Sequence, residues 1–258
     1  MSRRPIIAGN WKMHKTITEA VDFARNLKPA LAGMGDGVEV VICPAFTALA
    51  GVAEVLKDTG IAVGAQDVYW EESGAFTGEV SPGMLKDAGC RYVIAGHSER
   101  RQLFGETDEM TSEKFHHCVK CGLLPVLCVG ETDIERNSGM AEAVIKRQIE
   151  AVFGTLELYR ADRLIIIAYE PVWAIGTGKN ATSSDAQKAC ASIREEIERT
   201  TDTRTAKEAL VLYGGSVKST NAKDYLSQSD IDGLLVGGAS LDPEEFLSII
   251  REAAKLIG

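Results

Sequence analysis

The sequence predicts an α/β fold, a (β/α)8 barrel that residues 1–258 form as a single domain. The first observation is an alternation of short β-rich runs with longer amphipathic ones, which occurs eight times along the chain. The second is that most short runs are continuously apolar, as is typical of parallel strands covered on both faces. Eight such units in 258 residues match the size of a barrel, whereas a doubly wound sheet commonly has about five to seven strands. No composition break divides the chain, so one domain is the simpler interpretation.

Each expected strand is followed by a helical pattern. The strands are expected at residues 5–11, 38–46, 61–68, 91–97, 123–130, 164–170, 210–216 and 232–238. Three helix starts carry capping patterns, namely Thr16 with Glu19, Ser81 before Pro82, and Asp242 before Pro243 with a reciprocal Glu245. Helix ends are marked by Gly89, Gly122 and Gly154, because glycine commonly terminates a helix.

Composition narrows the class of protein. With 45% hydrophobic and 25% charged residues, the chain can bury a sizeable core. Its longest apolar runs fall far short of the roughly 18 to 20 residues that a membrane span needs, and no secretory signal is expected. A net charge of −9 without a long basic run argues against nucleic-acid binding. We therefore expect a cytoplasmic protein that binds neither membrane nor nucleic acid.

Six scattered cysteines are expected to be reduced thiols. Cys118 and Cys121 form a C-x-x-C pattern, but no second pair follows and the pattern lies late in an expected helix. Buried thiols are the favoured interpretation, and no metal site is expected.

Polar residues interrupt several strands at the point where each one ends. They are Asn10 and Lys12 in the first unit, His97, Ser98 and Glu99 in the fourth, and Glu170 in the sixth. Singly, a lysine or glutamate is usually a solvated charge and a histidine a structural residue. A barrel, however, brings the carboxyl ends of its strands to one mouth, where the chemistry of this fold is found. Their convergence therefore favours a catalytic site with a base, an imidazole and a cation.

Glycine-rich segments end the last two strands, GGS at 214–216 and GG at 237–238. Backbone N–H groups can approach an anion there because no Cβ obstructs them, so a phosphorylated small molecule is the expected ligand. Two nucleotide-binding interpretations fail. GTGK at 176–179 lacks the first glycine of a P-loop, and GMGDG at 33–37 follows a helix instead of a strand.

Six segments form an ordered set of motifs. They are GNWKM (9–13), GAFTGE (74–79), AGHSERR (95–101), AYEPVWAIGTGK (168–179), YGGSV (213–217) and LVGGASL (235–241). They closely resemble the triosephosphate isomerase family, and the likeness runs from residue 5 to the end of the chain. The resemblance implies a TIM barrel that interconverts dihydroxyacetone phosphate and D-glyceraldehyde 3-phosphate in glycolysis and gluconeogenesis, with no metal or organic cofactor.

The resemblance also implies a role for each matching residue. Glu170 would move a proton between two carbons, with His97 as a neutral electrophile at the substrate oxygens, a tuning known for the family. Lys12 would offset negative charge, and Asn10 would polarise the substrate. Ser98 and the buried carboxylate of Glu99 would support these residues. Substrate binding would involve Asn10, Lys12, Gly176, Ser216, Gly237 and Gly238. Pro171 and Val172 would begin the family's lid.

A homodimer is the implied assembly. The loop at 70–79 would enter a pocket of the partner subunit, with Thr77 near the partner's active site. Met13 and His14 would lie near the interface. His14 stands where many relatives have asparagine, a departure that touches subunit packing more than chemistry.

Two other functions stay open. One is a phosphosugar aldolase that forms a Schiff base through Lys12. The other is a catalytically silent barrel that serves as a binding scaffold, because fold alone does not establish activity.

Overall fold

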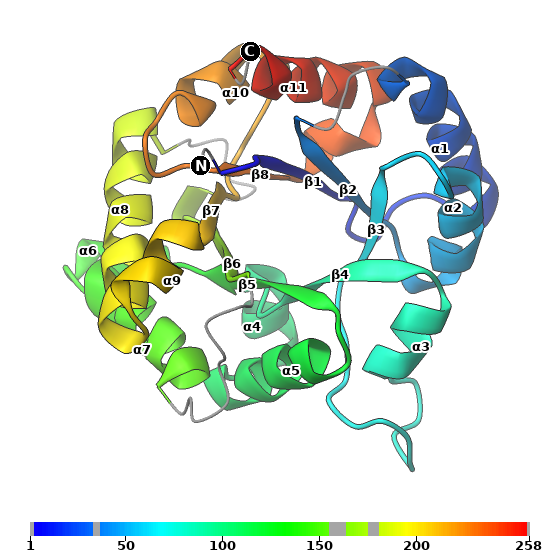
Figure 1. Cartoon of the computed structure of the whole chain (residues 1–258). Coiled ribbons are helices and arrows are strands. Elements are labelled where there is room, and N and C mark those ends of the chain that lie inside the picture. The colour runs from blue at the N-terminus through cyan, green and yellow to red at the C-terminus, as the bar shows by residue number, and fades with distance from the viewer. Residues whose placement is uncertain (1–2, 33–36, 155–163, 175–180, 257–258) are drawn as a thin grey trace.

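Eight parallel strands close into a barrel in sequence order, and the last strand pairs with the first. The computed structural model of the chain describes residues 3–32, 37–154, 164–174 and 181–256. The strands are β1 (Ile6–Asn10), β2 (Glu39–Cys43), β3 (Ala62–Ala65), β4 (Cys90–Ala95), β5 (Leu124–Val129), β6 (Ile166–Tyr169), β7 (Leu210–Tyr213) and β8 (Gly233–Val236). Figure 1 looks along the barrel and shows the helices as a ring around these strands. The predicted (β/α)8 barrel is confirmed.

The strands lie where the sequence predicts them, but they are shorter than predicted. Most of the polar and glycine-rich residues at the predicted strand ends lie beyond the hydrogen-bonded ladder, in the segments that surround the barrel mouth. Asn10 is the exception, since it is still paired with Cys43 in the register of β1 and β2. The apolar runs therefore form the wall of the barrel, and their polar ends are left available at its mouth.

Helices cover the outer face of the strands. The described α-helices are α1 (Ile17–Leu31), α2 (Leu49–Leu56), α3 (Pro82–Asp87), α4 (Ser98–Phe104), α5 (Asp108–Lys120), α6 (Asp133–Asn137), α7 (Ala141–Phe153), α8 (Ser183–Thr200), α9 (Thr203–Glu208), α10 (Ser219–Leu226) and α11 (Pro243–Lys255). Short 3-10 helices are η1 (Phe46–Ala48), η2 (Val172–Ala174) and η3 (Gly238–Leu241). Where more than one helix follows a strand, as α4 and α5 follow β4, the first begins at the barrel mouth.

Two of the three predicted helix starts are confirmed as predicted. Thr16 and Glu19 form a reciprocal capping box at α1, and Ser81 caps α3 ahead of Pro82. Asp242 also caps α11, but the predicted reciprocal contact of Glu245 is wrong. Its carboxylate instead accepts hydrogen bonds from the backbone N–H and the hydroxyl of Ser219, at 2.7 and 2.9 Å. Glu245 therefore joins the start of α11 to the start of α10.

The predicted glycine ends differ in conformation. Gly89 and Gly122 follow α3 and α5 in left-handed backbone, with φ of +90° and +79°, as the prediction requires. Gly154 does follow α7, but its φ is −72°, so its backbone does not turn left-handed there. All three glycines lie at helix ends, as the sequence predicts, but only Gly89 and Gly122 are left-handed.

Two apolar layers hold the barrel together. Side chains that point inward, such as those of Ile6, Ile94 and Leu212, fill the inside of the barrel. Side chains that point outward, such as those of Ile7, Val93 and Val211, pack against the helices in a larger cluster. Neighbouring residues of one strand belong to different layers because successive side chains point to opposite faces. The strands are apolar on both faces for this reason.

Gly233 permits the barrel to close between β8 and β1. It pairs with Ile6, and a Cβ at this position would lie 2.0 Å from the Ile6 carbonyl oxygen and 2.8 Å from the Ile6 nitrogen. These atoms belong to the neighbouring strand and cannot rotate away. Only glycine therefore allows the two backbones to come this close.

We predict that Gly233→Ala lowers the free energy of unfolding by about 2–4 kcal/mol, because the added methyl group forces β8 away from β1. Urea denaturation of the purified protein measures the change. Gly83→Ala is the matched control, since Gly83 lies on the exposed side of α3 and the nearest atom to an added Cβ is 3.8 Å away. Equal stability of the two variants would contradict the argument.

Candidate active site

A cavity of 610 Å³ opens at the carboxyl ends of the strands. Its lining residues are Asn10, Lys12, His97, Glu170, Gly214, Gly215, Ser216, Val217, Lys218, Leu235, Gly237, Gly238, Ala239 and Glu245. The four predicted catalytic residues thus face one space, although 160 positions separate the first from the last. Closure of the barrel brings them together, as the sequence interpretation requires.

Glu170 is almost fully buried directly after β6, with 2% of its surface exposed. One carboxylate oxygen accepts a hydrogen bond from the backbone N–H of Ser98 at 2.9 Å. The other lies 3.0 Å from Nε2 of His97. Burial alone would raise the pKa of Glu170, but attraction to His97, the His97 hydrogen bond and the Ser98 N–H outweigh it and lower the pKa. The carboxylate is therefore an ionised base that is almost fully buried.

His97 precedes α4 and is oriented by the start of that helix. Its Nδ1 accepts a hydrogen bond from the backbone N–H of Glu99 at 3.2 Å, which leaves the proton of a neutral ring on Nε2. Burial lowers the pKa of His97, but the attraction and hydrogen bond of Glu170 outweigh burial and raise it. The hydrogen bond from Glu99 to Nδ1 opposes this rise in the pKa, because protonation at Nδ1 would break that hydrogen bond. Without Glu170 beside it, burial and the Nδ1 contact favour the neutral ring, and the charge of Glu99 opposes them.

Lys12 reaches the cavity from strained backbone. Its φ is +53°, in the left-handed region that non-glycine residues rarely occupy. Its N–H donates to Oδ1 of Asn10 at 3.0 Å, and the side-chain amide of Gln66 donates to its carbonyl oxygen at 2.8 Å and to that of Cys43 at 2.9 Å. These bonds hold the lysine in a conformation that costs about 1–3 kcal/mol. Gln66 is a supporting residue that the sequence interpretation missed.

Glu99 pairs with Lys12 but is not the buried carboxylate that the resemblance implies. Its Oε1 lies 2.5 Å from Nζ of Lys12, while 39% of its side chain is exposed. The exposure arises because Glu99 borders a second cavity of 260 Å³, which it shares with Asn10, Lys12 and His97. Glu99 therefore contacts Lys12, but the burial that the resemblance implies is wrong for the single chain.

The predicted phosphate-binding backbone borders the same cavity as the catalytic residues. Ser216, Gly237 and Gly238 line it, and a Cβ at Gly238 would find no atom within 4 Å. A Cβ at Gly237 would lie 3.7 Å from Cε of Lys12, so this backbone is next to the cation. Gly176 lies outside the described residues, as do five other residues, at 175 and 177–180, of the predicted lid.

Two further glycines make room for Glu170, and the sequence interpretation missed both roles. A Cβ at Gly214 would lie 3.2 Å from Cγ of Glu170. A Cβ at Gly130, directly after β5, would lie 1.8 Å from the Glu170 carbonyl oxygen. Gly130 therefore allows the backbone after β6 to cross close to the end of β5. The glycine that ends the run LLPVLCVG was the available sequence signal.

The residues predicted at a dimer interface do not line the 610 Å³ cavity. Met13, His14 and Thr77 are all exposed in the single chain, Met13 by 94%. Met13 does line the 260 Å³ cavity, together with Phe46 and Phe104.

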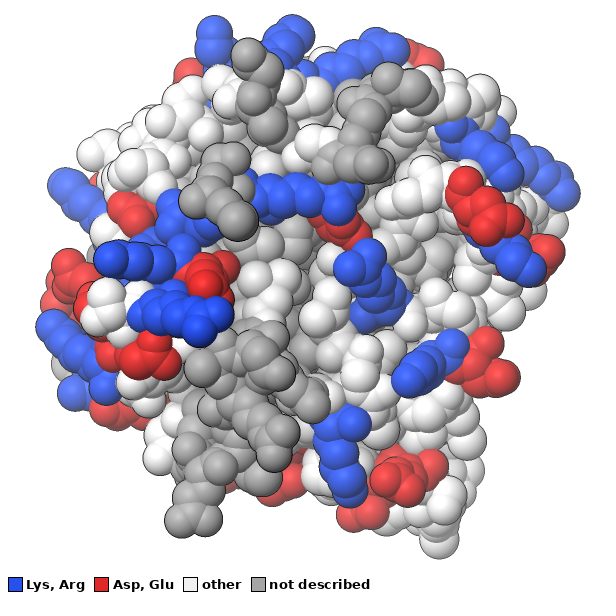
Figure 2. Space-filling model, viewed as in Figure 1, with Lys and Arg blue, Asp and Glu red and all other residues white. Residues whose placement is uncertain are grey.

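The surface carries charges of both signs, and the cysteines form no disulfide. Figure 2 shows Lys and Arg interspersed with Asp and Glu over the described part of one face. Among the described residues, no helix is long and apolar enough to cross a bilayer. All six cysteines are free, and all but Cys121 are buried. Burial raises the pKa of Cys90 to about 12 and that of Cys118 still further, so these thiols are unreactive.

Comparison with known proteins gives a consistent result. A sequence model described as triosephosphate isomerase matches residues 5–253. A triosephosphate isomerase of Symbiobacterium thermophilum is 52% identical over 253 residues, which cover 98% of each chain. Those of Moorella thermoacetica and Herpetosiphon aurantiacus are 52% and 49% identical, over 96% of this chain and 98% and 99% of their own. The chain therefore belongs to the triosephosphate isomerase family.

Proposed function

We propose that this chain interconverts dihydroxyacetone phosphate and D-glyceraldehyde 3-phosphate by moving one proton between adjacent carbons. The observation that carries the proposal is the ionised, buried carboxylate of Glu170 beside Nε2 of His97, in a cavity that also holds Lys12. The glycine-rich backbone at 214–216 and 237–238 borders that cavity and suits a phosphate group. Membership of the family supports the same activity.

The chemistry follows from the positions of these groups. A proton on a carbon next to a carbonyl is removed by a base, and the electron pair moves onto the carbonyl oxygen. Glu170 takes the proton, and the N–H at Nε2 of His97 donates to the oxygen that becomes negative. The ammonium group of Lys12 offsets the charge of the enediolate and the phosphate. His97 gives its Nε2 proton to that oxygen and takes the hydroxyl proton of the neighbouring oxygen, which becomes the new carbonyl. Glu170 returns the carbon proton to the adjacent carbon. Every step uses a side chain of this chain, so the proposal requires no cofactor.

The Schiff-base aldolase is a weaker alternative. An amine must be unprotonated to attack a carbonyl carbon. Nζ of Lys12 is instead held in an ion pair with Glu99 at 2.5 Å, so its nitrogen is not free to attack. The catalytically silent barrel is also disfavoured, because burial of an ionised carboxylate against a histidine costs stability and serves no packing purpose.

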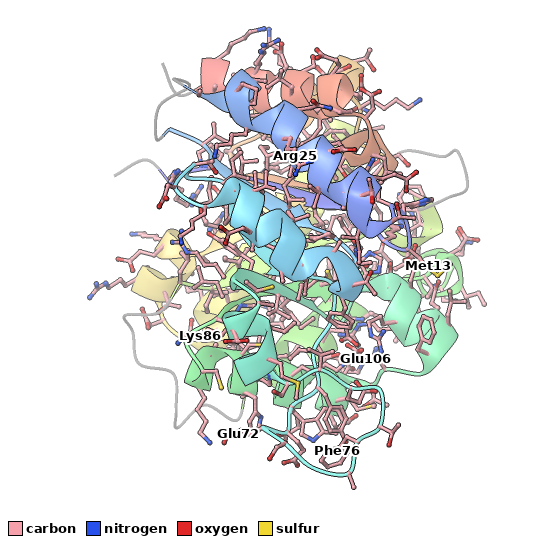
Figure 3. The ribbon with its side chains drawn as sticks, turned by 90° about the vertical axis from the view of Figure 1, so that its right-hand side faces the viewer. Met13, Arg25, Glu72, Phe76, Lys86 and Glu106 are labelled. Carbon is pink, nitrogen blue, oxygen red and sulfur yellow. The ribbon has the colours of Figure 1, made fainter. Side chains whose placement is uncertain are left out.

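We also propose that the active form is a homodimer. The loop at 70–79 projects from the body of the molecule, and Figure 3 shows Glu72 and Phe76 on it. It is folded on itself, since Tyr69 stacks on Trp70 at 4.1 Å and packs against Phe76 at 4.7 Å between ring centroids. An ordered, exposed loop with an apolar side chain is suited to docking.

The 260 Å³ cavity is the proposed receptor for the partner's loop. Met13 and Phe104 border it with 94% and 68% of their surfaces exposed, which is unusual for large apolar side chains. Lys12, His97 and Glu99 form its inner wall. A loop seated there would place Thr77 of the partner subunit beside these residues and would cover Glu99. The free, buried thiols support the proposal that the dimer acts in the reducing cytoplasm.

We predict that Glu170→Gln lowers kcat by about 10⁴-fold, because the amide cannot accept the proton. Glu170→Asp keeps a carboxylate but withdraws it by about one bond length, so we expect a loss of about a hundredfold. A coupled assay of glyceraldehyde 3-phosphate conversion measures both. A wild-type kcat/KM near about 10⁸ M⁻¹s⁻¹ would accord with the proposed activity.

The same assay separates the alternatives. A wild-type chain that binds phosphate ligands without turnover would establish the scaffold. Trapping of a covalent adduct by borohydride in the presence of substrate, lost in Lys12→Met, would establish the aldolase. Full activity in Glu170→Gln would show that another residue is the base.

For the dimer, we predict that Phe104→Glu weakens self-association by about a hundredfold or more, because a charge replaces an apolar anchor at the proposed interface. Activity at low protein concentration should fall in parallel. Sedimentation velocity over a dilution series measures the association. Ile134→Glu is the matched control, since Ile134 is 79% exposed on α6, which lies away from α1–α3. A fully active wild-type monomer would overturn the proposal.

A further inference from the structure

Trp173 lies directly beneath the guanidinium group of Arg136. The central carbon of that group is 3.9 Å from the centroid of the Trp173 ring, a close cation–π stack. Arg136 is on α6, whose start is fixed by a capping box between Thr132 and Glu135. A short, firmly capped helix therefore places a planar cation on the segment that directly follows the proposed base.

Glu131 holds the same tryptophan from another direction. Its Oε1 accepts hydrogen bonds from Nε1 of Trp173 at 2.8 Å and from the hydroxyl of Tyr169 at 3.1 Å, and its carbonyl oxygen accepts from the N–H of Val172 at 3.1 Å. The Glu131 carboxylate is 1% exposed, and Nη1 of Arg136 lies 3.7 Å from its Oε1. The segment at 170–174 is thus attached to the segment at 129–136 through backbone, carboxylate and ring.

This arrangement cannot be the one in which proton transfer occurs. Nε2 of His97 is engaged by Glu170 at 3.0 Å, yet the same N–H must donate to the substrate oxygen in the proposed reaction. Glu170 must therefore leave His97 when a ligand binds. Glu170 lines the 610 Å³ cavity, and its backbone continues directly into the segment that carries Trp173. A shift of the backbone at 170–174 would therefore carry the carboxylate away from His97.

We infer that Arg136 is a positioning residue that stabilises the ligand-free position of the segment at 170–174 by stacking on Trp173. The inference rests on the proposed function, since it assumes that Glu170 leaves His97 for the substrate. A contact that is present in the free state and weakened in the bound state reduces ligand affinity by its own free energy. Loss of the stack should therefore tighten ligand binding.

The test compares Arg136→Met, which keeps the length of the side chain and removes the cation, with the wild-type protein. The probe is 2-phosphoglycolate, whose planar carboxylate stands in for the enediolate and whose phosphate stands in for that of the substrate. We expect its Kd to fall by about twofold to thirtyfold, the range that corresponds to a cation–π contact of about 0.5–2 kcal/mol. Arg25→Met is the matched control, because Arg25 is an exposed arginine on α1 that pairs with Asp22. Its Kd should equal that of the wild type.

A second measurement reports on Trp173 without any ligand. Arg136 covers one face of the indole, so acrylamide should quench the tryptophan fluorescence of Arg136→Met more strongly than that of Arg25→Met. Trp11 and Trp70 contribute equally to both variants and cancel in the comparison. If Arg136→Met does not fold, Arg136→Lys serves in its place, because lysine keeps the charge and loses the planar stack.

The stack itself is isolated by repeating the substitution in a Trp173→Leu background. There Arg136→Met should leave the Kd unchanged within twofold. An equal tightening in that background would mean that Arg136 acts through Glu131, and it would overturn the assignment. So would an unchanged or weakened Kd in the single variant. Turnover of the wild-type sample is measured alongside, so that its absence would refute the proposed function while the binding data still decide the role of Arg136.

Discussion

The buried, ionised carboxylate of Glu170 is the constraint on which the rest of the site depends. Its burial restricts access of water, so protein groups must replace the hydrogen bonds that water would give. The N–H of Ser98 and the ring of His97 do so, and both come from the end of β4. β5 lies between β4 and β6, and Gly130 at its end lets the backbone of Glu170 pass. The order of β4, β5 and β6 is therefore needed to place the catalytic base as well as to build the core.

Lys12, the cation of the site, is held in strained backbone by hydrogen bonds from its neighbours. Lys12 occupies left-handed backbone, and the free energy that this costs must come from its surroundings. Asn10 and Gln66 supply it through hydrogen bonds to the N–H and the carbonyl oxygen of Lys12. Gln66 follows β3, so three neighbouring strands contribute to the placement of one ammonium group. Strain at a functional residue persists where rigid elements surround it, and the barrel wall is such an element.

The sequence is most informative where a pattern repeats along the chain. Eight apolar runs predict eight strands, and Glu170, His97 and Lys12 stand out because charged or polar groups at strand ends are difficult to explain by packing. The supporting residues could not be predicted in this way. Gln66 matters only because of the φ angle of Lys12, and Arg136 only because Trp173 lies beneath it. The exposure of Glu99 likewise depends on a cavity whose walls come from four separate segments. These properties arise from tertiary contacts, which a pattern along the chain does not contain.

His97 illustrates why the contacts that hold the free state must be weak. Nε2 bonds to Glu170 in the free chain and must bond to the substrate during the reaction, so each contact that stabilises the first arrangement adds to the barrier for the second. A fully buried cation stacked on Trp173 would hold the segment firmly and slow its release. A partly exposed guanidinium on an indole contributes only about 1 kcal/mol, which is enough to order the segment and little enough to be overcome by binding of the phosphate. Arg136, with 38% of its side chain exposed, is suited to that intermediate strength.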